Sequence, residues 1–127
     1  MKSSPDTGVR TFGVAIHNAS GSSVQRYSST VRALNTWYHV AGVYDAVAQT
    51  LNIYVNGVLN NGVLSGTVPT SQRASTVAAN IGRRSGGFHI QGIVDDVRVY
   101  GRALSVTEIQ ADMNTAVGGA AGDTTTP

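Results

Sequence analysis

Apolar residues recur at every second position along much of the chain, which is the spacing of a half-buried β-strand. Residues 9–17 and 50–56 show this alternation most clearly. The side chains that share a face are Phe12, Val14 and Ile16 in the first segment and Leu51, Ile53 and Val55 in the second. Both segments are therefore predicted to be strands with one face toward a core.

Short polar runs between these segments are typical of turns. Residues 18–23 (NASGSS) form one such run. The pair Asn56-Gly57 follows the second strand directly, and Asn-Gly tolerates positive φ at both central positions of a type I′ turn. We therefore expect a hairpin here, with the return strand beginning at Val58-Leu59.

Further strands are predicted in four apolar stretches, namely residues 24–34, 36–44, 76–82 and 88–100. Both faces of the 36–44 stretch are apolar, so it is placed centrally in its sheet. Residues 60–75 are expected to be irregular because Pro69 cannot donate to a strand ladder. Residues 83–87 are expected to join the last two strands.

One short helix is predicted near the C-terminal end. Ser105 suits the N-cap position and Glu108 completes a capping box, while Leu104 and Ile109 form a hydrophobic staple. Val106, Ile109 and Met113 then lie at i, i+3 and i+7 and share one helix face that can dock on a sheet. The predicted class is all-β: an antiparallel β-sandwich with one short C-terminal helix.

Composition narrows the domain organisation and the functional class. The chain has 127 residues, 41% hydrophobic and 13% charged, as expected for one folded domain. Residues 1–8 are expected to be disordered or an added N-terminus, residues 9–116 the domain, and residues 117–127 a flexible Gly/Thr-rich linker. No apolar window is long enough to span a membrane, and the N-terminus lacks the apolar region of a signal peptide.

Charge and cysteine content exclude further classes. The formal net charge is +2, with nine Lys and Arg residues spread along the chain, so nucleic-acid binding is not expected. The chain contains no cysteine, which excludes disulfides and thiolate chemistry. The three histidines, His17, His39 and His89, have no short spacing typical of zinc ligands. His39 is instead expected to be structural, packed near Trp37.

Three segments in order carry a family resemblance: NTWYHVAGVYD (residues 35–45), LNIYVNG (51–57), and FHIQGIVDDVRVYGRALSVTEI (88–109) with the preceding Asn80-Ile81-Gly82. Together they resemble the laminin-G-like jelly-roll modules of the concanavalin A-like lectin/glucanase superfamily in bacterial secreted proteins. The resemblance implies a concanavalin A-like jelly roll. It also implies an extracellular or cell-surface location within a larger bacterial protein.

The sequence departs from this family at its start. Such modules begin with two or three more strands before the region that matches residues 11–16, and the first of these pairs near the strand matching residues 93–100. An apolar edge without its neighbour invites pairing with another chain. We therefore expect a fragment, a homodimer that completes the sheet, or a rewired sandwich.

Asp95 is the polar residue singled out in residues 93–100, because alternation places it with Ile93, Val97 and Val99. A carboxylate on an apolar face needs a partner. The resemblance to laminarinase-type glucanases implies that Asp95 helps hold a structural calcium. The alternative is an aspartate held by hydrogen bonds, since calcium needs six to eight oxygen ligands and one acidic ligand is evident here.

A catalytic role is not predicted. Retaining glucanases need two carboxylates about 5 Å apart. The adjacent acids Asp95 and Asp96 point to opposite faces of a strand, and Glu108 is used by the helix cap. No nucleophile motif is present. A glycan-active hydrolase or lyase therefore stays a third hypothesis.

The predicted function is recognition of a glycan or an extracellular protein by a non-catalytic module. The candidate ligand-binding residues are Tyr54, Arg83, Arg84, Phe88 and His89, because sugar sites combine aromatic and planar polar groups. The alternative for each aromatic residue is packing within a strand, and for the arginine pair a solvated turn. A second hypothesis is a structural or protein–protein module that uses the open sheet edge.

Overall fold

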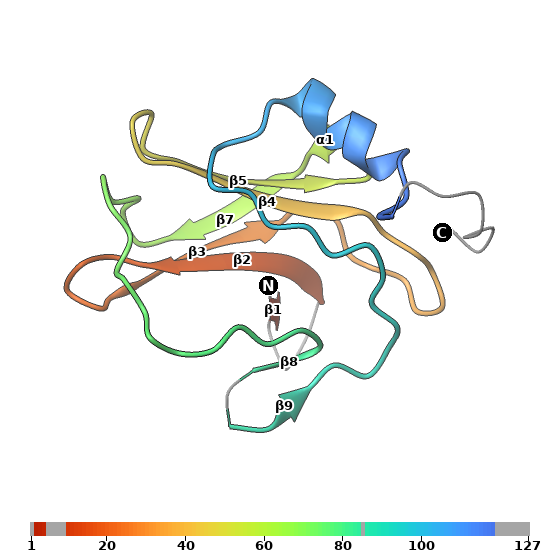
Figure 1. The fold of residues 1–127 in the computed structure, drawn as a ribbon, viewed down its shortest axis with the longest axis horizontal. Coiled ribbons are helices and arrows are strands. Elements are labelled where there is room, and N and C mark those ends of the chain that lie inside the picture. Colours follow the sequence, from red (N-terminus) through yellow and green to blue (C-terminus); the bar gives the residue numbers. More distant parts are fainter. Residues whose placement is uncertain (1, 5–9, 85, 119–127) are drawn as a thin grey trace.

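Two antiparallel sheets form the body of the molecule in the computed structural model, which describes residues 2–4, 10–84 and 86–118 (Figure 1). The first sheet has the order β1-β2-β3-β7, with β1 at Lys2–Ser4, β2 at Thr11–His17, β3 at Ser23–Ser28 and β7 at Asn61–Ser65. The second has the order β4-β5-β6, with β4 at Val40–Asp45, β5 at Thr50–Val55 and β6 at Val58–Leu59.

Two smaller elements complete the fold. Strands β8 (Arg83–Arg84) and β9 (Phe88–His89) form a two-stranded hairpin, and helix α1 spans Val106–Met113. The helix lies above β4 and β5, and the hairpin lies at the opposite end of the molecule (Figure 1). The described part of the chain contains no helix with the length and apolar character needed to cross a bilayer.

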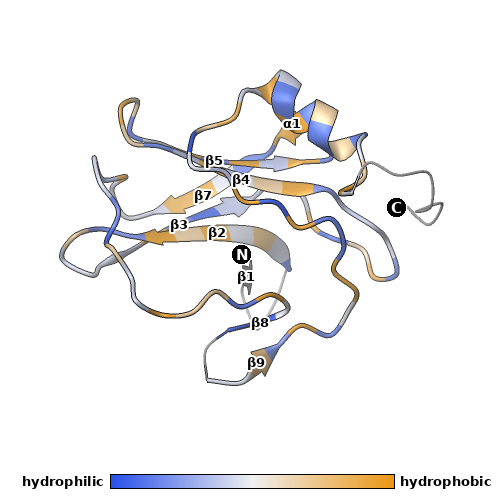
Figure 2. Ribbon diagram, viewed as in Figure 1, coloured by the Kyte–Doolittle hydropathy of each residue, from blue (hydrophilic) through white to orange (hydrophobic). Residues whose placement is uncertain are grey.

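The core lies between the two sheets, as the alternating pattern predicts. Ile16, Val24, Leu51 and Val68 form a buried cluster, and Val14 and Tyr44 pack against it. On β5 the three alternating apolar side chains are all buried, while the residues between them are partly exposed. The hydrophobic positions of β2 and β5 are visible in Figure 2. The fold class predicted from sequence, an antiparallel β-sandwich with one short helix, is confirmed.

The sheets approach each other closely where β4 faces β2. A Cβ atom added to Gly42 would lie 2.6 Å from Cγ2 and 2.9 Å from Cβ of Val14. Contacts this short do not occur between carbon atoms. The close packing of the sheets therefore favours glycine at position 42, with no left-handed backbone conformation involved, and a larger residue would force Val14 or a strand to move.

A side chain also joins the two sheets by hydrogen bonds. Arg26 of β3 donates from Nε to the carbonyl oxygen of Leu51 at 2.8 Å and from Nη1 to that of Gly62 at 3.0 Å. Leu51 belongs to β5, and Gly62 belongs to β7. The guanidinium group thus links the backbones of both layers.

The predicted β5–β6 hairpin is confirmed. Asn56 and Gly57 have φ of 51° and 74°, the left-handed pair that a type I′ turn requires. The turn is covered by the helix, because Gln110 donates from Nε2 to the Gly57 carbonyl at 3.0 Å. A Cβ at Gly57 would lie 2.9 Å from Cγ of Gln110 and 3.4 Å from Cε of Met113.

The predicted helix start is also confirmed. Ser105 is the N-cap, its hydroxyl accepts from the Glu108 N–H, and the Glu108 carboxylate accepts from the Ser105 N–H. Ile109 is 1% exposed, so the predicted docking face is buried at this position. Arg102 adds two hydrogen bonds to the Glu108 carboxylate.

Several predicted strands are wrong. Residues 76–82 and 93–100 belong to no ladder among the described residues, and the 88–100 stretch keeps only β9 as a strand. The 24–34 stretch ends as a strand at Ser28. Residues 60–75 were expected to be irregular, yet β7 pairs with β3 in this range. Strand β7 ends at Ser65, so Pro69 lies beyond it and does not interrupt the ladder. β-Branched composition favours an extended backbone, but a ladder also needs a neighbouring strand.

The structure describes only part of the two segments that were expected to flank the domain. Lys2–Ser4 pair with β2 as strand β1, within the segment expected to precede the fold. Residues 5–9 and most of the expected linker, residues 119–127, lie outside the described residues.

Candidate functional site

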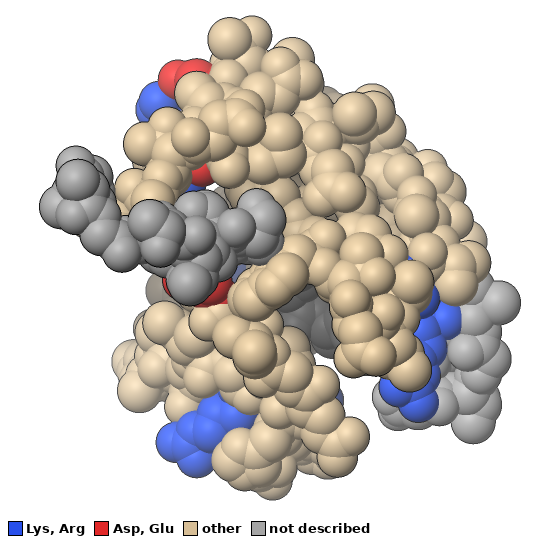
Figure 3. All heavy atoms as spheres, turned by 90° about the vertical axis from the view of Figure 1, so that its right-hand side faces the viewer, with Lys and Arg blue, Asp and Glu red and all other residues tan. Residues whose placement is uncertain are grey.

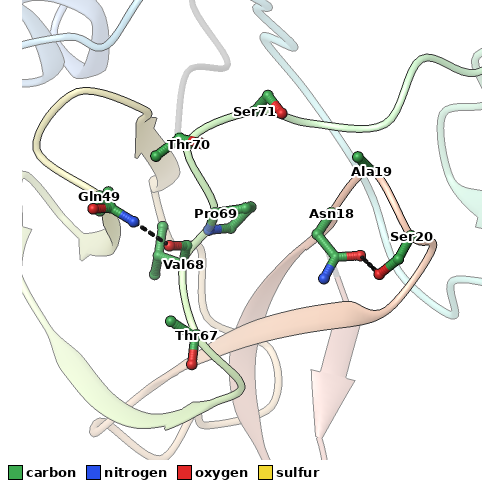
Figure 4. A pocket seen from close by; sticks show the side chains of 9 residues that line it. All are labelled: Asn18, Ala19, Ser20, Gln49, Thr67, Val68, Pro69, Thr70 and Ser71. Atoms are coloured by element: carbon green, nitrogen blue, oxygen red, sulfur yellow. Dashed lines mark hydrogen bonds between the residues drawn. The ribbon is translucent and has the colours of Figure 1, made fainter.

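A shallow pocket of about 500 Å³ lies where three loops meet. The loops follow β2, β4 and β7, and the pocket is lined by Asn18, Ala19, Ser20, Gln49, Thr67, Val68, Pro69, Thr70 and Ser71 (Figure 4). The loops converge because their strands come from both sheets and end at the same edge of the sandwich. The loop ends of such scaffolds are frequent sites of binding.

Hydrogen bonds to the backbone hold the wall of this pocket. Gln49 donates from Nε2 to the Val68 carbonyl at 3.1 Å, and Tyr44 donates from its hydroxyl to the Pro69 carbonyl at 2.8 Å. Both bonds tie the loop after β7 to the β4–β5 hairpin. Val68 is itself buried in the core cluster, so the loop is anchored at its centre.

The opposite wall is an equally ordered turn. The Asn18 side-chain oxygen accepts from the Ser22 N–H at 2.8 Å and from the Ser20 hydroxyl at 2.7 Å. Gly21 completes the turn with φ of 88°, a conformation that glycine adopts without strain. The Arg73 N–H donates to the His17 carbonyl at 2.9 Å, which joins the turn to the other loop.

The polar groups around the pocket are hydroxyls and amides, and none of its lining residues carries a charge. Within the described chain, the hydroxyl groups of Thr67, Thr70 and Ser71 make no hydrogen bond to protein. They can therefore donate to and accept from a ligand. Hydroxyls and amides at fixed positions match an uncharged polyhydroxylated molecule better than an anion or a metal ion.

Four of the five ligand-binding residues predicted from sequence are close together, but not at this pocket. Arg83 and Arg84 form β8, and Phe88 and His89 form β9, so all four belong to one exposed hairpin. The Arg84 guanidinium lies 4.1 Å from the centre of the Phe88 ring. Tyr54 lies apart from them, on β5 between Ala41 and Leu59. Their role in binding stays a prediction.

Asp95 is exposed, contrary to its expected position on a buried face. Its carboxylate accepts a hydrogen bond from the N–H of Asp96 at 2.8 Å. Among the described residues no three acidic or histidine side chains form a group that could hold a metal. The surroundings described here thus supply fewer acidic ligands than protein calcium sites commonly use, and calcium at Asp95 stays a prediction.

Each acidic side chain in the described part of the chain has a local hydrogen-bonding partner. Glu108 is held by Arg102 and by the Ser105 N–H, and these hydrogen bonds lower the pKa of its carboxyl group to about 2. Asp45 accepts from the N–H groups of Val47 and Ala48, and Asp95 accepts from the N–H of Asp96. Asp96 accepts from the Val117 N–H, and Asp112 accepts from the Tyr100 hydroxyl. These contacts assign the carboxylates to turns and to the helix.

His39 is partly buried at the start of β4. Its backbone N–H donates to the side-chain oxygen of Asn56 at 2.9 Å, while the ring atom Nδ1 is buried without a hydrogen-bond partner. Burial lowers the pKa of His39 below its ordinary value, and the positive charge of Arg98 lowers it further. The burial of Nδ1 agrees with the structural role expected for this residue. Trp37, its expected neighbour, is 43% exposed.

The pocket was not identified from sequence, because its lining residues are of types common in every loop. Asn18, Ser20, Thr70 and Ser71 are ordinary turn residues, and nothing in their spacing shows that two loops 50 residues apart meet. Among the lining residues, only Pro69 had been singled out from the sequence, and it was interpreted as a break in a strand.

Comparison with known proteins supports the architecture. Residues 4–110 match the pattern of the concanavalin A-like lectin/glucanases superfamily, in its laminin-G type. No curated protein matches the chain. The fold is similar to that of residues 221–444 of an S-layer domain-containing protein from Clostridium thermocellum ATCC 27405, with a TM-score of 0.50 and 19% identity over 85% of this chain.

The chain covers 64% of that solved structure. At this low identity the similarity shows a shared fold and no more. The family pattern covers most of the sequence, and the sandwich of antiparallel sheets agrees with it. The chain therefore belongs to the concanavalin A-like lectin/glucanase superfamily.

Proposed function

We propose that this chain is a non-catalytic recognition module of a secreted or cell-surface protein, and that it binds a neutral carbohydrate at the loop pocket. The observation that carries the proposal is the chemistry of the pocket, where hydroxyl and amide groups gather without a charged side chain. The superfamily includes lectins, which agrees with a carbohydrate ligand. The S-layer domain-containing neighbour supports a surface location.

The ordered walls of the pocket favour binding. Its backbone is fixed by Gln49, Tyr44 and Asn18, so little conformational entropy is lost when a ligand is held. The Pro69 ring offers an apolar surface for the C–H groups of a sugar. No aromatic ring lines the pocket, so we expect weak affinity for a single sugar unit.

The absence of catalysis is supported by the acidic residues. Glycoside hydrolysis needs one carboxyl group to act as an acid and a second to act as a nucleophile or base. The carboxylates described in this chain are engaged in turns and in the helix cap, and none lines the pocket. A module that holds its ligand without altering it fits this arrangement.

The test is a titration of the isotope-labelled chain, followed by amide chemical shifts, with neutral gluco-, manno- and xylo-oligosaccharides. We expect saturable shifts at residues 18–20 and 67–71. Thr70→Ala and Ser71→Ala should each weaken binding several-fold, because each removes a hydroxyl group that faces the ligand. Thr76→Ala, an exposed threonine outside the pocket, is the matched control. No shift with any of these sugars would refute neutral-carbohydrate binding at this pocket.

The β8–β9 hairpin is a second candidate for a different ligand. The exposed pair of Arg84 and Phe88 combines a cation with an aromatic face, which suits an acidic sugar. Titration with sulfated and uronic-acid oligosaccharides distinguishes the two sites: shifts confined to residues 83–89 would move the proposed site to the hairpin. Repeating both titrations with calcium and with a chelator tests the calcium prediction at Asp95.

A further inference from the structure

Residues 93–100 (IVDDVRVY) form a segment that is neither helix nor strand and has no neighbouring strand among the described residues. From β9 the chain rises along the right-hand side of Figure 1 and then crosses the front of the sandwich before it reaches α1. This side of the molecule is largely uncharged, with small separate groups of acidic and basic residues (Figure 3).

One face of the segment is attached to the end of the helix. Arg98 donates from Nη1 to the Asp112 carbonyl at 2.7 Å and also bonds the Thr115 carbonyl. The Tyr100 hydroxyl donates to the Asp112 carboxylate at 2.7 Å. Asp96 accepts from the Val117 N–H at 3.0 Å. These contacts hold the segment in place and fix which of its faces points outward.

The other face is apolar and open. Ile93, Val97 and Val99 are 77%, 45% and 92% exposed, although β-branched residues in alternation are typical of a buried strand face, and Val94 and Tyr100 at the alternate positions are 43% and 45% exposed. Asp95 is on this face as well. Three exposed β-branched side chains in one row are unusual on a surface that has no partner.

The backbone of the segment is also free. No residue from 93 to 100 makes a backbone–backbone hydrogen bond with another described residue. The Asp96 N–H bonds the side chain of Asp95 instead, and Asp96 has φ of 48°, a strained conformation for a residue other than glycine. A segment with open N–H and C=O groups becomes a template for strand addition once it is extended.

We propose that residues 93–100 bind the same segment of a second copy of this chain as an antiparallel strand pair, with Val97 opposite Val97 of the second copy. In a two-fold symmetric antiparallel pair, opposite residues must share a face. Centring the pair on Asp95, Asp96 or Arg98 would place like charges opposite each other. Centring it on Val97 avoids this conflict.

The Val97-centred register is also complementary in charge. It places Asp96 of each copy opposite Arg98 of the other, and such cross-strand pairs are stabilising. Arg98 has five N–H donors, so it can keep its bonds to the helix carbonyls while it meets a carboxylate. Pairing requires Asp96 to leave its left-handed conformation for the extended one, which is the common conformation for aspartate.

The first experiment measures the mass of the 127-residue chain by sedimentation equilibrium from micromolar to millimolar concentration. We expect a reversible monomer–dimer equilibrium. Val97→Lys should weaken dimerisation about tenfold or more, because two lysines would be directly opposite. Val99→Lys should weaken it less or strengthen it, since position 99 is opposite Asp95 of the second copy. Monomers at every concentration, or a larger effect of Val99→Lys, would overturn the proposal.

The second experiment exchanges the charges. Asp96→Arg and Arg98→Asp should each weaken self-association, because each places like charges opposite each other. An equimolar mixture of the two variants should dimerise, since every charged pair is then of opposite sign. Circular dichroism of each variant checks that it is folded, and failure of two folded variants to combine would refute the register. A structural role of these residues within one chain would produce no such recovery on mixing.

Discussion

Replacing Gly42 by alanine tests whether the two sheets pack as described. The new Cβ would lie 2.6 Å from Cγ2, 2.9 Å from Cβ and 3.4 Å from Cγ1 of Val14. All three of these atoms belong to one side chain on the facing strand. The added methyl group must therefore push β2 and β4 apart or force Val14 from its rotamer.

The magnitude follows from this geometry. Overpacking a core by one methyl group costs about 1–3 kcal/mol, and contacts below 3 Å place Gly42→Ala at the upper end of that range. The φ angle of Gly42 is not in the left-handed region, so backbone strain contributes nothing. Gly101→Ala is the matched control, because a Cβ there meets no atom within 4 Å and should change stability by less than about 0.5 kcal/mol.

A double-mutant cycle separates this contact from other causes. Val14→Gly alone should cost about 2–3 kcal/mol through lost apolar contact and greater chain entropy. In that background Gly42→Ala should cost little or be stabilising, because the three atoms nearest to the new Cβ have been removed. The expected coupling energy is thus about 2–3 kcal/mol, within the range found for residues in contact.

The assay is urea unfolding followed by far-UV circular dichroism, with the slope checked for each variant. Additive free energies of unfolding in the double variant would show that positions 14 and 42 do not meet. That result would refute the face-to-face packing of β2 on β4. A mild effect of Gly42→Ala alone, close to that of Gly101→Ala, would lead to the same conclusion.

Two more predictions concern the helix and pH. Gly57→Ala should lower the free energy of unfolding about 1–3 kcal/mol more than Gly82→Ala. Both glycines have nearly the same φ, but of the two Gly57 alone lies under the helix. Equal losses in urea unfolding would show that the helix does not cover this turn. The lowered pKa of His39 means that the unfolded chain binds the proton at higher pH than the folded chain, so stability should fall as pH drops below about 6.5. Comparing urea midpoints at pH 7.5 and 5.5 checks this, and a drop of the same size in His39→Gln would contradict the assignment.

Local sequence signals predicted the local structure well. The alternation in residues 50–56, the Asn56-Gly57 turn and the capping box at Ser105 depend on neighbouring residues alone, and each is found as predicted. Such features are determined by side-chain period and backbone preference within a few residues.

Features that depend on distant parts of the chain were predicted less well. Residues 93–100 have the composition of a strand but no partner strand in the described structure, and composition does not reveal that. Strand β7 was missed because its partner β3 lies more than 30 residues earlier. The loop pocket was missed for the same reason, since its walls come from separate loops.

The position of Arg26 between the layers has a mechanical consequence. Hydrophobic contact resists separation of the two sheets, but it is non-directional and offers little resistance to sliding. The hydrogen bond from Arg26 to the Leu51 carbonyl is directional and crosses between the sheets, while the bond to the Gly62 carbonyl stays within one sheet and holds the guanidinium group in place, so sliding one sheet along the other must break the bond to Leu51. This single side chain therefore resists shear within the sandwich.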